Sequence, residues 1–177
     1  MRIAPIINQL TPEARNARNE RRCERGVWHK MRLWHYRLLP YLPDAQFRGQ
    51  LRELVAIMRD WRDKGKTNHL LINKVTEYSK EHLAEYFNIY SAVYFMRYGK
   101  NIKSEYIQEF NNFSPDHLPP RAPIFPEWHN GTYLNICMAN LFEKHRFGSG
   151  KSRITEEEWE YLCEGYEAIT RKRFRME

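Results

Sequence analysis

Apolar side chains recur at helical spacing in four long stretches of this chain, and no stretch shows the apolar–polar alternation of a half-buried β-strand. The first stretch covers residues 44–64, where the apolar positions are Phe47, Leu51, Leu54, Val55, Met58 and Trp61. Gly65 follows directly, and glycine is common just past a helix end. The spacing therefore predicts a helix over 44–64, with Asp44 as its N-cap.

The other three stretches predict helices in the same way. Ser79 is a suitable N-cap for a helix that ends near Tyr98, because Gly99 follows. We expect its inner side to carry Leu83, Phe87, Tyr90, Val93 or Tyr94, and Phe95. A third helix is expected over about 130–145, and the pair Thr155 and Glu158 forms a capping box that opens the last one.

Proline-rich segments separate these helices. Pro40 and Pro43 favour an extended segment over 31–43, packed on the core by its leucines and aromatic residues. Five prolines between residues 111 and 127 exclude regular structure there, after a short amphipathic piece at 102–110. The sequence therefore predicts an all-α fold, a small single-domain helical bundle with long loops.

The net charge of +7 is distributed unevenly along the 177 residues. Residues 1–30 hold seven Arg/Lys against three Glu, residues 31–66 hold eight against four Asp/Glu, and residues 171–177 hold four against one. Clustered cations attract phosphate backbones, although a solvated basic surface has the same composition. Because residues 1–30 have few apolar side chains, we expect a basic N-terminal extension, mobile or a lone helix, before a helical domain at 31–177.

Several classes of protein are excluded by what the sequence lacks. The cysteines are odd in number and far apart, and the histidines have no metal-binding spacing. No glycine-rich phosphate loop is present, and no apolar run is long enough for a membrane span or a secretory signal. Cys137 and Cys163 lie on apolar helix faces, where we expect buried structural thiols. We expect a cytoplasmic protein with no metal, no cofactor and no membrane partner.

One carboxylate is distinctive within the helix predicted over 44–64. Glu53 lies among four arginines, while the other acids of the helix interior come at its far end, Asp60 and Asp63. The arginines are Arg48, Arg52, Arg59 and Arg62. If their guanidinium groups are close, they stabilise the Glu53 anion. An ordinary surface glutamate is the alternative that this pattern leaves open.

Longer blocks of sequence carry more information than single residues. MRLW at 31–34 precedes LPDAQFRGQLREL at 42–54, and NKVTEYSKEHLAEYFNIYSAVYFMRYGKNI follows at 73–102. TYLNICMANLFEK lies at 132–144 and EEWEYL at 157–162. In order and spacing these blocks resemble the pyrimidine-dimer DNA glycosylase (endonuclease V) family, and most of all a bacterial branch that opens MRLWH.

This resemblance implies a DNA repair N-glycosylase with abasic-site lyase activity on damaged duplex DNA. In the family, the N-terminal α-amine attacks the sugar C1′ and forms a Schiff base, assisted by a helix glutamate that follows an arginine. That pair corresponds to Arg52 and Glu53, and the position of the nucleophile corresponds to Met31. An α-amine has a pKa of about 7.7 to 8.0, so part of it is neutral near pH 7. Arg32, Gln46 and Lys144 match family positions expected to contact DNA.

Three departures from the family affect this reading. Met31 is preceded by 30 residues, so it has a free amine only if translation starts there or the leader is cleaved. Two arginines of the family fall at Ala56 and Asn140. Phosphate contacts would then be redistributed, and the sequence offers Arg48, Arg59 and Lys74 for them.

Two other functions remain open. The extension would abolish the lyase chemistry if no amine is freed at Met31, leaving a non-catalytic nucleic-acid-binding module of the same fold. A helical protein-interaction domain is the third reading. For the enzyme, we expect a monomer whose partner is duplex DNA, and the sequence does not name the lesion.

Overall fold

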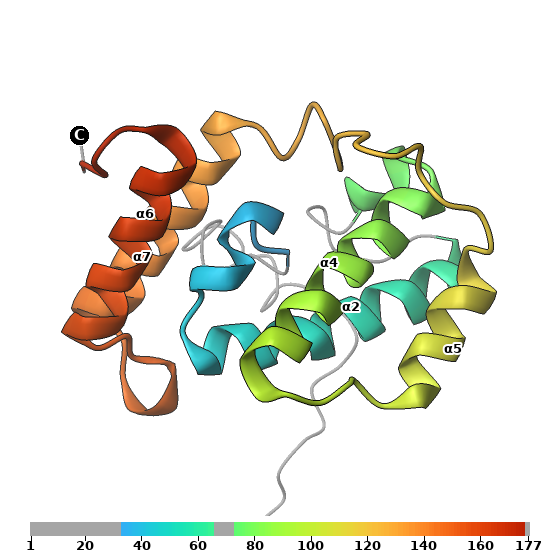
Figure 1. The fold of residues 1–177 in the computed structure, drawn as a ribbon, viewed down its shortest axis with the longest axis horizontal. Helices are drawn as coiled ribbons and strands as arrows, with labels where there is room; N and C mark the ends of the chain where they lie inside the picture. The colour runs from blue at the N-terminus through green and yellow to red at the C-terminus, as the bar shows by residue number, and fades with distance from the viewer. Residues whose placement is uncertain (1–32, 66–72, 176–177) are drawn as a thin grey trace, which may run out of the picture. The chain divides into compact units, whose positions relative to one another are not determined.

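The computed structural model describes residues 33–65 and 73–175, which form helices and connecting loops without a β-strand (Figure 1). The predicted all-α fold is confirmed. Within these residues, no helix is long and apolar enough to cross a membrane. Residues 1–30 lie outside the described residues, so the predicted boundary between extension and domain stays a prediction.

The described chain contains five α-helices and three short 3₁₀ helices. In chain order they are η1 (Tyr36–Tyr41), α2 (Asp44–Lys64), η2 (Val75–Glu77), α4 (Lys80–Tyr98), α5 (Ser104–Phe113), α6 (Gly131–Phe147), η3 (Gly150–Ser152) and α7 (Glu156–Thr170). Helices α6 and α7 lie side by side, and α2, α4 and α5 form a second group (Figure 1). Helix η1 contacts both groups through α4 and α7. The core therefore surrounds η1.

Helices α2 and α4 end where the sequence predicts. Gly65 and Gly99 both adopt the left-handed conformation, with φ of 70° and 62°, which glycine reaches without steric strain. The N-cap of α2 is Pro43 and not Asp44, which is the first helical residue. The two helices run antiparallel, because Tyr90 of α4 stacks on Phe47 of α2 and Tyr98 contacts Asp44.

The segment expected to be extended is partly helical, and that prediction is wrong for residues 36–41. They form the 3₁₀ helix η1 with Pro40 inside it. The fold stabilises this turn in two ways: Leu38 and Leu39 are completely buried, and Arg97 donates hydrogen bonds to the carbonyl oxygens of Pro40 and Leu42. Tertiary contacts thus outweigh the local preference of a proline-containing segment.

The remaining helices follow their sequence signals closely. In α7, Thr155 Oγ1 accepts from the Glu158 backbone N–H, and Glu158 Oε2 accepts from the Thr155 N–H at 2.9 Å, so the predicted capping box is present. Helix α5 ends at Phe113, whose ring packs on Trp61, so the expected absence of regular structure is wrong for residues 111–113; the first proline comes only at Pro115. The expectation for Phe95 is wrong: its side chain faces solvent and is 53% exposed.

Candidate active site and nucleic-acid interface

One side of α2 carries three polar residues spaced at i, i+4 and i+7: Gln46, Gln50 and Glu53. This spacing places them in a row along the helix. Gln46 and Gln50 are buried. Glu53 is partly exposed, with one carboxylate oxygen shielded from solvent. The row thus ends in a carboxylate that lies at the border between core and surface.

The chain at Leu33–His35 is attached to this row and to two neighbouring helices. Gln50 Oε1 accepts a hydrogen bond from the Trp34 N–H at 2.8 Å. Tyr86 of α4 donates to the Trp34 carbonyl at 2.7 Å, and Tyr133 of α6 donates to the Leu33 carbonyl at 2.5 Å. These buried bonds fix the backbone of a segment that starts two residues after Met31.

Burial keeps both phenols in their donor form. Desolvation raises the pKa of Tyr86 and of Tyr133 well above the ordinary tyrosine value. Cys137 of α6 accepts from the His35 N–H at 3.3 Å, and burial raises the pKa of its thiol. Cys137 is thus the buried structural thiol that the sequence predicts, and Cys163 is half-buried with a pKa raised in the same direction.

Two histidines add hydrogen bonds near residues 33–35, and neither serves as an acid or base near pH 7. The ring of His35 bonds the His129 carbonyl through Nε2 at 2.9 Å and the Arg37 N–H through Nδ1. Burial lowers the pKa of His35 to about 4, and burial also lowers that of His129 well below the ordinary value. Both rings are therefore neutral near pH 7 and serve the fold.

The Gln46 side chain and the Lys144 carbonyl both bond to the loop around η3. Gln46 Nε2 donates to the Ser152 carbonyl of η3 at 3.0 Å. The Lys144 carbonyl in the last turn of α6 accepts from the N–H groups of Gly148 and Ile154, which flank η3. The η3 loop therefore joins the start of α2, which carries Gln46, to the end of α6, which carries Lys144.

The arginines of α2 do not surround Glu53. Arg48, Arg59 and Arg62 bind the carboxylates of Asp44, Glu109 and Asp63, respectively. Arg52 is exposed and forms no ion pair with the described residues. The α2 arginines lie on strips of the helix other than the Glu53 row, since neighbouring positions on a helix differ by about 100° in direction. Of the four, Arg52 is the one without a carboxylate partner among the described residues.

The other predicted DNA contacts are spread over the surface. Arg48 lies over the Tyr98 ring at 5.1 Å, on the side of α2 away from Gln46. Lys74 lies before η2 and pairs with Glu77 at 3.6 Å, toward the opposite end of α2. Met31 and Arg32 lie outside the described residues. The structure therefore joins Gln46 to the loop at the end of α6. Glu53 lies on the same side of α2 about two turns farther along the helix, and Arg48 and Lys74 lie elsewhere.

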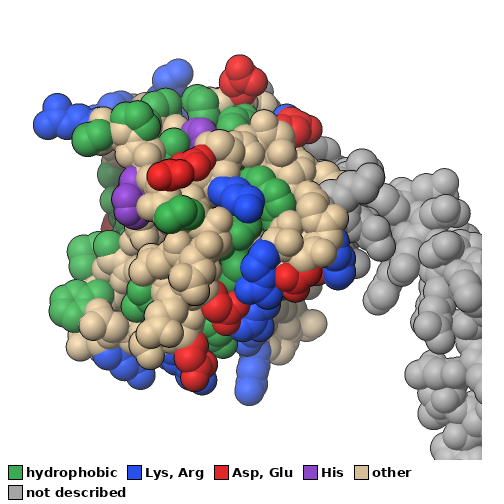
Figure 2. Space-filling model, turned by 90° about the vertical axis from the view of Figure 1, so that its right-hand side faces the viewer, with side chains coloured by type: hydrophobic (Ala, Val, Ile, Leu, Met, Phe, Trp, Pro, Cys, Tyr) green, Lys and Arg blue, Asp and Glu red, His purple; other side chains and the backbone are tan. Residues whose placement is uncertain are grey.

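The surface on the α5 side carries charges of both signs. Figure 2 shows Lys and Arg side chains interspersed with Asp and Glu there, without a continuous basic patch. Three of the ion pairs involved are Arg59–Glu109, Arg62–Asp63 and Lys64–Asp60. Contact with a polyanion on this side would depend on individual cations.

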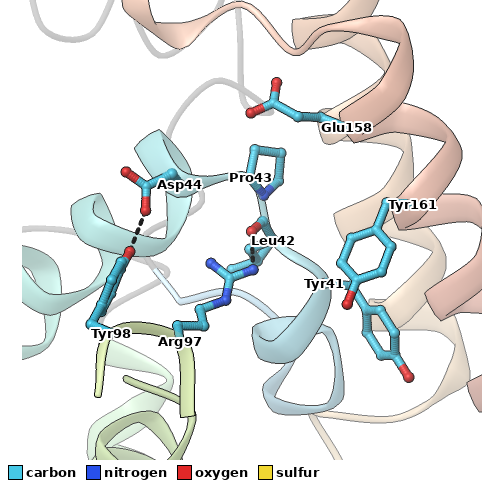
Figure 3. A pocket seen from close by; sticks show the side chains of 8 residues that line it. All are labelled: Tyr41, Leu42, Pro43, Asp44, Arg97, Tyr98, Glu158 and Tyr161. Carbon is cyan, nitrogen blue, oxygen red and sulfur yellow. Dashed lines mark hydrogen bonds between the residues drawn. The ribbon is translucent and has the colours of Figure 1, made fainter. Parts of the chain in front are cut away.

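A pocket of about 330 Å³ lies where η1, α2, α4 and α7 meet (Figure 3). Its charged groups are engaged by the fold: Tyr98 bonds Asp44, Arg97 bonds backbone carbonyls, and Glu158 belongs to the capping box. Asp44 is nine residues before Glu53 and so points to the opposite side of α2. This pocket is therefore separate from the Glu53 row.

Sequence reasoning missed the residues that hold the segment at 33–35. Gln50 had a usable signal, because it lies four residues after Gln46 and three before Glu53, on the same side of the predicted helix. Tyr86 and Tyr133 gave no such signal. Each looks like an ordinary core aromatic until the tertiary structure shows the acceptor of its hydroxyl.

The fold and site together define an all-α domain in which the side of α2 that carries Glu53 also holds the chain at residues 33–35 through Gln50. Residues 31–106 match the model of a protein family described as pyrimidine dimer DNA glycosylase. The match supports the family that the sequence blocks resemble. It does not distinguish the MRLWH branch from the rest of the family, and it ends before α6 and α7. No curated protein and no solved structure matched the chain.

Proposed function

We propose that this protein is a DNA repair glycosylase with abasic-site lyase activity, in which the amine of Met31 is the nucleophile and Glu53 assists. The observation that supports this most directly is the fixed segment at 33–35. Its backbone is bonded to Gln50 on the same row as Glu53, and Met31 is only two residues upstream. A nucleophile needs this kind of positioning, because misplacement by about 1 Å can cost a hundredfold in rate.

The proposed reaction has two stages. The neutral amine attacks C1′ of the damaged nucleotide, the bond from C1′ to the base breaks, and the base leaves with a proton. Ring opening then gives a Schiff base between the amine and C1′. Glu53 takes the proton from C2′, and the electron pair expels the 3′ phosphate by β-elimination.

The electrostatics suit these roles. A carboxylate at the border between core and surface can stabilise the cationic sugar and still reach solvent to exchange its proton. The target nucleotide would be extruded from the duplex to expose C1′. We further propose that the protein acts in the cytoplasm as a monomer and belongs to the MRLWH branch.

A trapping experiment tests the proposal. Borohydride reduces a Schiff base to a stable covalent adduct, so abasic-site DNA should be trapped by a chain that begins at Met31. Glu53→Gln should still bind this DNA but lose strand cleavage, while Glu105→Gln, an equal charge change on exposed α5, should cleave normally. If neither the full chain nor the shortened chain forms an adduct, the lyase proposal is wrong.

The full chain itself favours one competing function. Because 30 residues precede Met31, the unprocessed chain has no amine at that position and could act as a binding module alone. Removing residues 1–30 deletes a net charge of +4, so non-specific DNA affinity and its salt dependence should fall. Lyase activity should rise in the same variant. A binding module without catalysis would show the first effect and not the second.

A further inference from the structure

The end of α6 and the loop around η3 carry cations without matching acids. Residues 144–153 contain no Asp or Glu, and their cations are Lys144, Arg146, Lys151 and Arg153. None of these cations forms an ion pair with the described residues, whereas three of the α2 arginines do. We call residues 144–153 the α6–η3 corner.

One large apolar side chain lies among these cations. Phe147, the last residue of α6, is 83% exposed, more than any other large hydrophobic residue that the structure describes. Water solvates a phenyl ring poorly, so the ring gains free energy when another apolar surface covers it. Single exposed apolar residues are common on protein surfaces, but this one is flanked in sequence by charges that attract a polyanion.

The corner is held in a defined shape. The Lys144 carbonyl accepts from the Gly148 and Ile154 N–H groups at 3.0 and 3.4 Å. Glycine is needed at position 148, because a Cβ there would overlap the Lys144 carbonyl oxygen. Phe147 therefore extends from a braced helix end, which reduces the entropy lost when its ring is covered.

The corner is attached to the side of α2 that carries Glu53. Gln46, on the same row as Glu53, donates to the Ser152 carbonyl within the corner at 3.0 Å. Glu53 is seven residues farther along α2, about 10.5 Å along the helix axis. Base pairs of a duplex follow one another at about 3.4 Å, so this separation spans about three base-pair steps. A duplex that reaches Glu53 along this row therefore extends past the attachment point of the corner.

A nucleic acid satisfies both parts of the corner. Its phosphates are anions for the unpaired cations, and its bases offer flat apolar faces to the phenyl ring. Free phosphate would leave the ring uncovered. An anionic membrane would cover both parts as well, but the bond from the Glu53 row to the corner favours DNA, because it places the ring near the proposed reaction site.

We propose that Phe147 is a wedge residue, which inserts between two neighbouring base pairs of duplex DNA and kinks the duplex close to the nucleotide that reacts at Glu53. This inference rests on the proposed function, since it takes duplex DNA as the substrate. Apolar wedges of this kind partly unstack the bases and bend DNA by about 20 to 90°. The kink lowers the cost of extruding the reacting nucleotide, because a bent duplex is already partly unstacked.

The first test measures binding and bending by the full chain. The probe is a duplex with a tetrahydrofuran abasic-site analogue, which cannot form a Schiff base, and energy transfer between dyes at its two ends reports the bend. Phe147→Ala should weaken binding about tenfold and remove most of the bend. Phe147→Leu should keep the bend, because leucine also serves as a wedge. Phe95→Ala removes an exposed phenyl ring from α4 and should change neither quantity.

The second test separates the wedge from the charges around it. A wedge contacts no phosphate, so Phe147→Ala should lower the affinity without changing its salt dependence. Arg146→Ala, one residue away, should make the salt slope shallower by about one and leave the bend in place. Because Phe147 is exposed, its replacement should also leave the melting temperature unchanged.

Three outcomes would overturn the wedge. The first is an unchanged bend with Phe147→Ala, and the second is a salt slope that becomes shallower with it. The third is Phe147-dependent binding to phosphatidylserine vesicles with unchanged DNA bending, which would assign the ring to a membrane. The trapping experiment judges the lyase separately, so a chain that bends DNA without forming an adduct keeps the wedge and loses the proposed chemistry. A full chain that does not bind the duplex contradicts both proposals.

Discussion

Replacing Gln50 by leucine isolates the contribution of the attachment at residues 33–35. Leucine keeps most of the buried volume but removes the oxygen that accepts from Trp34. Tyr86 keeps its shorter bond to the Trp34 carbonyl, while the buried Trp34 N–H loses its acceptor. This change alters the site without altering the net charge.

The size of the effect follows from the burial of the donor. Gln50 is 1% exposed and Trp34 is 6% exposed, so water does not replace the lost acceptor. A buried donor left without a partner costs about 1 to 3 kcal/mol. A loss of about 2 kcal/mol in a domain of this size lowers the melting temperature by about 4 to 8 °C.

Gln46→Leu is the matched control, one turn earlier on the same side of α2. The substitution removes one hydrogen bond, from Gln46 Nε2 to the Ser152 carbonyl. It also removes the buried Oε1, which has no hydrogen-bond partner, and this gain offsets part of the loss. We expect a cost below about 0.5 kcal/mol. Urea unfolding of both variants measures the difference. If Gln50→Leu is no less stable than Gln46→Leu, the attachment of Trp34 does not stabilise the fold as argued.

Three further predictions concern other parts of the fold. Gly165→Ala should destabilise α7 by about 1 to 3 kcal/mol, because a Cβ there would overlap the Tyr41 ring; adding Tyr41→Ala should relieve the strain, and additive losses in denaturant would contradict this. The folded-state pKa of His35 is about 4, below the unfolded value of 6.5, so the unfolded chain binds more protons between these values. The free energy of unfolding should therefore be at its full value above pH 6.5 and fall by about 3 kcal/mol on acidification to pH 4. The urea midpoint of His35→Asn should change less over this pH range. Thr155→Ala removes the capping box and should cost about 1 kcal/mol by thermal unfolding, whereas the exposed Ser104→Ala should cost less.

The helix ends could be predicted because they depend on local chemistry. Gly65 and Gly99 occupy left-handed positions that the chain itself favours, and Thr155 with Glu158 closes a cap within four residues. The spacing of Glu53 from neighbouring arginines is also visible in the sequence, but the structure does not gather those arginines around it.

Other features depended on residues far apart in the chain. The helical turn η1 forms despite Pro40 because Arg97, 57 residues later, binds its last carbonyls. Phe95 and its neighbour Met96 face solvent, 53% and 71% exposed, because no other element of the described residues covers that side of α4.

The sequence by itself determined the long helices and most of their ends, because helical periodicity and capping act over a few residues. Only the tertiary structure decided which arginine of α2 lacks a carboxylate partner among the described residues, since Arg59 meets its carboxylate 50 residues away on α5. It also decided that Gln50 holds Trp34, and that Gln46 holds the η3 loop. Each of these depends on how helices approach one another, and packing of whole elements sets that approach rather than the preference of any short segment.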